Sequence, residues 1–146
     1  MENWSLKPKK EIVMAGDIVV ANGTLRLVLE FVEVDTSDSG VRVRLQINYN
    51  GIHQTFAWTV DQLWIEYDEL RKFEDELGEG VEARLRDMSD YPVLHLRCHP
   101  SGEELTINPL NERQSLDGEA VVVRLKINSG SIQALHASLT KFPKWW

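Results

Sequence analysis

Four histidines and one cysteine are the residues of this 146-residue chain best suited to metal binding or nucleophilic catalysis. His95 and His99 have the four-residue spacing of a helical metal-binding pair, but the alternation in VLHLRC (93–98) predicts a strand there. In a strand these two side chains are about 13 Å apart, at about 3.3 Å per residue, which is too far for one ion. We therefore expect no metal site, and no cofactor is needed.

Cys98 shares the predicted inward face of that strand with Leu94 and Leu96, so we expect a small core residue. Adjacent residues of a strand point to opposite faces, which separates Cys98 from His99 and argues against a nucleophile pair. Neither a G-x-S-x-G sequence nor a P-loop, dinucleotide-binding or zinc-protease motif is present. The sequence thus predicts a protein that is not an enzyme.

Acidic residues are concentrated in residues 61–79, DQLWIEYDELRKFEDELGE. This segment contains eight acidic and two basic residues, so it carries −6 of the net charge of −7. The rest of the chain is close to neutral, and the sequence pI of about 5.1 argues against a main partner whose phosphates need clustered Lys and Arg. Nucleic acid is therefore not an expected partner.

The same segment has the apolar period of a helix over about 61–77. The residues of the apolar stripe are Leu63, Tyr67, Leu70, Phe73 and Leu77. Thr59 and Gln62 have the spacing of a capping box at its start, and Gly78 is suited to its C-terminal end.

Local ion pairs explain part of the charge on this helix, because Asp68–Lys72 and Arg71–Asp75 are one turn apart. Residues 74–76 (EDE) are unexplained, since the helix dipole disfavours negative charge in the last turn by about 0.3–1 kcal/mol each. Two interpretations stay open: the acidic face maintains solubility, or it docks a basic protein with an apolar anchor. The residues expected on such a docking surface are Asp61, Trp64, Ile65, Asp68, Glu69, Asp75 and Glu76.

Alternation of apolar and polar residues predicts antiparallel strands elsewhere. The predicted strands are 24–34, 41–49, 80–86, 93–98, 104–108 and 119–128. A change of apolar phase after Phe31 predicts a β-bulge, and Asn22-Gly23 and Asn50-Gly51 have the composition of two-residue hairpin turns.

A second helix is predicted over about 130–142, with Ser129 or Ser131 as its N-cap and Pro143 after its end. Its apolar stripe consists of Ile132, Leu135, Leu139 and Phe142. Hairpins dominate and βαβ units are absent, which favours an α+β fold of antiparallel β-meanders with two packed helices. The chain has no long linker or repeat, so we expect a single domain over 1–146.

Tryptophan side chains offer further candidates for binding. Trp58 alternates with Phe56 in a strand-like run and is expected in the core, whereas Trp64 lies on the flank of the predicted helix. A pocket between sheet and helix lined by Trp58 and Trp64 is one alternative site. Trp145 and Trp146 either fold back over a sheet edge or belong to a partner surface.

The N-terminal apolar run is interrupted by Glu11 and Asp17, so a secretory signal is not expected. No apolar stretch approaches the roughly 18 residues that a membrane span needs. These features predict a cytoplasmic protein without a membrane partner.

The element order resembles that of small bacterial immunity proteins of the WapI type. The resemblance spans most of the chain and rests on a β-meander, a central Trp-containing helix, a second meander and a C-terminal helix ending in SLTKFP (138–143). It does not extend to Lys144, Trp145 and Trp146. It implies stoichiometric neutralisation of a cognate toxin, commonly a nuclease, without catalytic residues.

The resemblance and the acidic helix together predict an immunity-like protein that binds a basic toxin domain. The alternative is a scaffold domain or small-ligand binding module. The sequence leaves the oligomeric state and the identity of the partner open.

Overall fold

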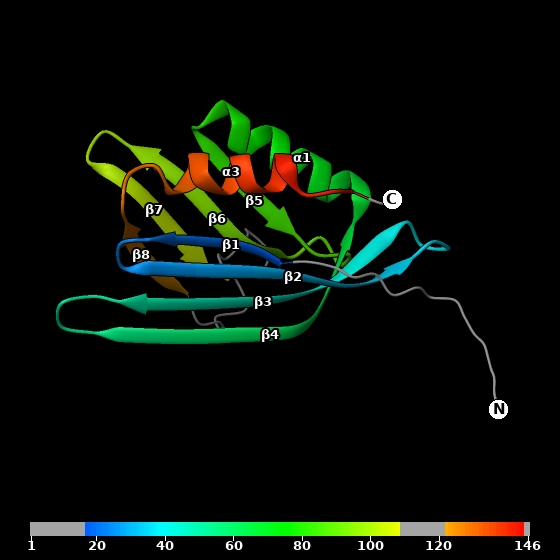
Figure 1. Cartoon of the computed structure of the whole chain (residues 1–146), viewed down its shortest axis with the longest axis horizontal. Coiled ribbons are helices and arrows are strands. Elements are labelled where there is room, and N and C mark those ends of the chain that lie inside the picture. The colour runs from blue at the N-terminus through cyan, green and yellow to red at the C-terminus, as the bar shows by residue number, and fades with distance from the viewer. Residues whose placement is uncertain (1–16, 109–121, 145–146) are drawn as a thin grey trace, which may run out of the picture.

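A computed structural model describes residues 17–108 and 122–144 of the chain (Figure 1). The described residues form eight strands and two helices, which confirms the predicted α+β class. The strands are β1 (Asp17–Asn22), β2 (Leu25–Asp35), β3 (Gly40–Asn50), β4 (Thr55–Glu66), β5 (Glu82–Arg86), β6 (Pro92–His99), β7 (Gly102–Ile107) and β8 (Val123–Ile127). The helices are α1 (Tyr67–Glu79) and α3 (Ser131–Lys141).

The strands form two antiparallel sheets in sequential order, β1-β2-β3-β4 and β5-β6-β7-β8. Alternation is clearest in β3, where Val43, Leu45 and Ile47 are fully buried and the intervening side chains are not. The register of β2 against β3 shifts between Phe31 and Glu33, which confirms the bulge predicted after Phe31.

Helix α1 packs against β5 and α3, and α3 packs against β1, so the helices join an edge strand of each sheet. Figure 1 shows the two helices side by side above the strands of the first sheet. Their apolar stripes enter one core that both sheets share, with Phe73 of α1 and Leu139 of α3 fully buried. Burial of a side chain such as Phe73 contributes about 1.5–3 kcal/mol.

The predicted start of the first helix is wrong. Residues 61–66 continue β4, and α1 begins only at Tyr67. Leu63 pairs with Val43 and Ile65 with Val41, so this stretch buries alternate residues against β3. Leu63 satisfied the helical and strand periods alike, and pairing with β3 decided between them.

The predicted ends of both helices also need correction. Glu66, not the Thr59/Gln62 pair, is the N-cap of α1, and it makes no side-chain capping bond. The helix ends at Gly80 instead of Gly78, because Gly80 adopts a positive φ of 75° that suits a C-cap glycine. Helix α3 matches the prediction of 130–142 to within one residue at each end.

Neither predicted Asn-Gly turn has the expected form. The β1–β2 loop is Gly23-Thr24, with Gly23 at a φ of 62°, while Asn22 ends β1 and donates a 2.9 Å hydrogen bond to the Ser131 hydroxyl. Residues 51–54 form a four-residue β3–β4 loop. Part of the predicted strand 119–128, and the residues Trp145 and Trp146, lie outside the described residues.

Candidate functional site

His95 and His99 lie on β6, as predicted, and each has its own carboxylate partner. The Nε2 atom of His95 is 2.8 Å from Glu82, and that of His99 is 3.4 Å from Glu104. In residues 17–108 and 122–144, no group of three or more His, Cys, Asp or Glu side chains is arranged to hold a metal ion.

Burial is the main influence on His95, whose side chain is 10% exposed. It lowers the pKa of His95 below the ordinary 6.5, although the hydrogen bond with Glu82 acts in the opposite direction. That hydrogen bond is also the main cause of the lowered pKa of Glu82. The pair is therefore a neutral imidazole that donates to an ionised carboxylate.

The prediction that Cys98 is a core residue is wrong, because its side chain is exposed. Cys98 pairs with Glu103 close to the β6–β7 turn, where the sheet extends beyond the buried core. Burial along β6 ends at Leu96. Residues on both faces of β6 are buried up to Leu96, and the alternating pattern gave no sign of where this covering layer ends.

The seven residues predicted to dock a partner do not share one helical face. Asp61, Trp64 and Ile65 belong to β4, and the other four belong to α1. Ile65 is fully buried opposite Val41, so it cannot serve as an exposed apolar anchor. Trp64 lies on the opposite side of β4 and is partly exposed.

Two glutamates in the last turns of α1 have partners within the fold. Glu76 accepts the backbone N–H of Arg84 on β5 at 2.9 Å. Glu74 accepts the Thr140 hydroxyl at 3.0 Å and lies 3.4 Å from the Lys144 ammonium. These contacts explain why the chain keeps carboxylates where the helix dipole disfavours them, and they remove both from a free docking surface.

The remaining acidic residues differ in their pairing. Asp61 lies 3.2 Å from Nε of Arg44, and Asp68 pairs at 2.9 Å with Arg71 instead of the predicted Lys72. The predicted Arg71–Asp75 ion pair is absent in the part of the chain that the structure describes, where the exposed Asp75 carboxylate has no ion pair.

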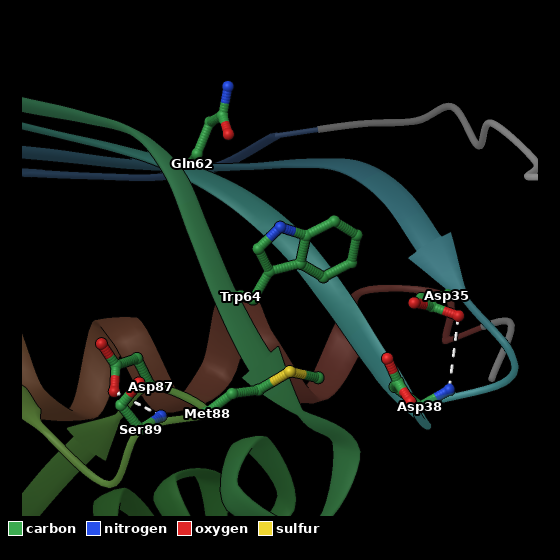
Figure 2. A pocket seen from close by; sticks show the side chains of 7 residues that line it. All are labelled: Asp35, Asp38, Gln62, Trp64, Asp87, Met88 and Ser89. Atoms are coloured by element: carbon green, nitrogen blue, oxygen red, sulfur yellow. Dashed lines mark hydrogen bonds between the residues drawn. The ribbon is translucent and has the colours of Figure 1, made fainter.

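A hollow of about 480 Å³ opens beside Trp64 (Figure 2). The side chains that line this acidic hollow are Asp35, Asp38, Gln62, Trp64, Asp87, Met88 and Ser89. Figure 2 shows the indole of Trp64 projecting from β4 toward the turn that carries Asp35 and Asp38. Of these seven residues, only Trp64 was predicted as a site residue, because the others come from β4 itself (Gln62) or from the turns after β2 and β5, and they form no recognisable motif.

Backbone hydrogen bonds hold the walls of the acidic hollow together. The Met88 N–H donates to the Trp64 carbonyl at 2.9 Å, and the Tyr67 N–H donates to the Ser39 carbonyl at 2.9 Å. The β2–β3 turn therefore contacts the start of α1, and the turn after β5 contacts the end of β4. Gly40 permits this packing, because a Cβ there would meet the Met88 methyl and lie 3.1 Å from the Ile65 carbonyl.

The carboxylates of the acidic hollow are fixed by their own turns. Asp35 Oδ1 accepts the N–H groups of Ser37 at 3.0 Å and Asp38 at 3.3 Å, and the bond from Asp38 is the main reason that the pKa of Asp35 is lowered. Asp87 Oδ1 accepts the N–H groups of Ser89 and Tyr91, both at 2.9 Å. None of the seven lining residues is basic. Carboxylates beside an exposed indole suit a cationic group.

Trp58 and Trp64 lie on opposite faces of β4, so within residues 17–108 and 122–144 they do not line one pocket as predicted. Trp58 pairs with Ile47 and packs partly buried against the core, whereas Trp64 pairs with Arg42 on the outer face of the sheet. The bulge in β4 opposite Val43 and Leu45 separates the two positions. Only Trp64 lines the acidic hollow.

Neither helix in residues 17–108 and 122–144 combines the length and apolar character of a membrane span. Comparisons with protein-family models, curated proteins and solved structures each find no match.

Proposed function

We propose that this protein is an immunity-like binding protein that neutralises a basic toxin domain by stoichiometric binding at the acidic hollow. The observation that carries the proposal is the gathering of Asp35, Asp38 and Asp87 around the exposed ring of Trp64, with no basic side chain in the lining. This arrangement combines an apolar anchor with negative charge. Of the seven residues that the sequence predicted on the docking surface, Trp64 is the one that lines the acidic hollow.

An arginine side chain of the partner fits this chemistry. Its planar guanidinium stacks on an indole, an interaction worth about 0.5–1 kcal/mol when exposed and about 2 kcal/mol when desolvated. Its N–H groups match carboxylates in a fixed fork geometry. The turns that hold Asp35 and Asp87 in place limit the conformational entropy lost when the guanidinium binds.

The first turn of α1 extends the negative surface. Asp68 and Glu69 follow Tyr67, whose N–H joins the helix to the turn that carries Asp38. Exposed carboxylates at such a rim speed the encounter with a basic protein and make association sensitive to salt. Asp68 is paired with Arg71 and Asp61 with Arg44, and Asp75 lies about two turns along the helix from Asp68. We therefore assign these three carboxylates a smaller role than the carboxylates of the hollow.

The resemblance to WapI-type immunity proteins supports a toxin as the partner. Toxin domains that act on nucleic acid carry basic side chains where they bind phosphate. An acidic surface that occupies this site blocks it without chemistry. The alternative is a module for a small cationic ligand, which the hollow volume of about 480 Å³ would accommodate.

The proposal is tested with a toxin domain encoded beside this gene, expressed under an inducible promoter with and without the protein. Survival should require the intact acidic hollow. Trp64→Ala and the double variant Asp35→Asn/Asp87→Asn should raise the dissociation constant at least tenfold and abolish protection, with folding checked by thermal melting. Asp75→Asn is the matched control, since it removes one exposed charge away from the hollow, and it should retain protection.

Calorimetric titration at low and high salt supplies the physical readout. Binding should weaken as salt is raised, because rim carboxylates contribute to association. Full protection by the Trp64→Ala and Asp35→Asn/Asp87→Asn variants would rule out the hollow as the site. Tight binding of arginine amide alone, without any effect of the protein on toxicity, would instead favour the small-ligand module.

A further inference from the structure

Strand β4 is the last strand of its sheet, so only one of its edges pairs with β3. The direction of its backbone groups follows from Asn50 at the end of β3, whose N–H donates to the Thr24 carbonyl on the β2 side at 2.9 Å. Successive residues of a strand direct their backbone groups to alternate sides. Tyr49, Ile47 and Leu45 therefore direct theirs toward β4.

The partners of these three residues are Phe56, Trp58 and Val60, which must bond back to β3. The intervening residues Thr55, Ala57 and Thr59 consequently point their N–H and C=O groups away from the sheet. The same alternation, continued from the Val43–Leu63 pair, directs the carbonyl of Trp64 outward, where it accepts the Met88 N–H.

The outward groups of Thr55, Ala57 and Thr59 accept or donate no hydrogen bond in the part of the chain that the structure describes. Strand β4 also lacks the lysine, proline or inward charge that commonly protects an edge. Residues 55–60 (TFAWTV) are uncharged, and the adjacent Ile52 is 94% exposed. This stretch is a free edge that can accept another strand.

We propose that the free edge at Thr55–Thr59 pairs antiparallel with the same edge of a second copy of this chain. Charge favours this occupant over a basic protein. Two copies of an acidic chain can approach here without opposing carboxylates, because the acidic hollow and the first turn of α1 lie at the other end of β4. A basic partner would find no counter-charge along residues 55–60.

A two-fold axis at Ala57 makes the edge self-complementary. Thr55 then faces Thr59 of the second copy, a favourable cross-strand pair, and Asp61 faces the loop residue His53 of the second copy instead of another carboxylate. On the inner side, the partly buried Phe56 would face Trp58 of the second copy, and Trp58 would face its Phe56. The β1–β4 sheet of one copy and the β1–β4 sheet of the other would form one continuous eight-stranded sheet.

The experiment measures the oligomeric state of the full chain by sedimentation velocity over a wide range of concentrations. The wild type should show a concentration-dependent dimer. Ala57→Pro removes an outward N–H without touching the bonds to β3, so it should raise the dimer dissociation constant at least tenfold. Ala57→Val keeps the N–H and should dimerise like the wild type.

A second pair of variants covers the case in which the proline disturbs folding. Ala57→Lys places two like charges directly opposite each other at the two-fold axis and should also give a monomer, whereas the uncharged Ala57→Met should stay dimeric. Binding of a basic protein at the acidic hollow should be unaffected by Ala57→Lys, which separates this proposal from the proposed function. A wild type that is monomeric throughout, or a dimer that persists in Ala57→Pro and Ala57→Lys, would overturn the pairing. The monomeric result would leave the edge to an extended strand of another protein.

Discussion

The carboxylate of Glu103 on β7 accepts the backbone N–H of Ile132 on α3 at 2.9 Å, although the two residues are 29 positions apart. Its other oxygen accepts the N–H of Gly130 at 3.0 Å. The start of α3 is thus capped by a strand of the second sheet. The predicted caps do not act this way, because the Ser131 hydroxyl donates to the Asn128 carbonyl.

Replacing Glu103 should therefore destabilise the protein as the loss of a helix cap does. We expect Glu103→Ala to lower the free energy of unfolding by about 1–2 kcal/mol, since it leaves two N–H groups without an acceptor. Urea denaturation measures the change. Glu104→Ala is the control next to it, because it removes only a long 3.4 Å contact with His99, and its effect should stay below about 1 kcal/mol. Equal effects of the two substitutions would contradict the capping role.

Removing the adjacent carboxylates of Glu76 and Asp75 on α1 should change the free energy of unfolding in opposite directions. Glu76→Ala removes the acceptor for the Arg84 N–H, so it should lower the free energy of unfolding by about 0.5–1.5 kcal/mol. Asp75→Ala removes an exposed charge near the negative end of the helix dipole and should be neutral or stabilising by about 0.3–1 kcal/mol. Both values come from chemical denaturation at low salt. Destabilisation by Asp75→Ala as large as that by Glu76→Ala would show that the contact of Glu76 with β5 is not what distinguishes the two carboxylates.

The His95–Glu82 pair should make stability depend on pH. The pKa of His95 is lower in the folded protein than the ordinary 6.5, so the unfolded chain takes up this proton first as pH falls. The stability is therefore complete above about pH 6.5 and declines as pH falls toward the folded pKa. The lowered pKa of Glu82 adds a further loss below its ordinary 4.5.

His95→Gln should flatten the stability profile just below pH 6.5, because the amide can donate to Glu82 without titrating. Thermal melting followed between pH 7.5 and about pH 4 measures this profile. His53→Gln, at an exposed position in the β3–β4 loop, is the matched substitution. An unchanged profile in His95→Gln would show that another group causes the acid sensitivity.

The sequence determined the local structure wherever the apolar residues fitted only the strand period or only the helical period. Alternation in β2 and β3 and the phase change after Phe31 gave the two central strands of the first sheet and the bulge between them, and the stripe through Leu135 and Leu139 gave α3. These signals are local, because side chains two residues apart in a strand, or three and four apart in a helix, share a face. The same reasoning failed at residues 61–66, where Leu63 fitted both periods.

Only the tertiary structure decided which acidic residues are available to a partner. Glu74 and Glu76 became internal acceptors because α3 and β5 pack beside α1. The acidic hollow formed because turns at residues 35–38 and 87–89 meet the end of β4. The sequence shows which side chains are present and how apolar and polar residues alternate. Which turns come into contact depends on how the two sheets and two helices pack around one core. That packing rests on contacts between distant segments, which no local period encodes.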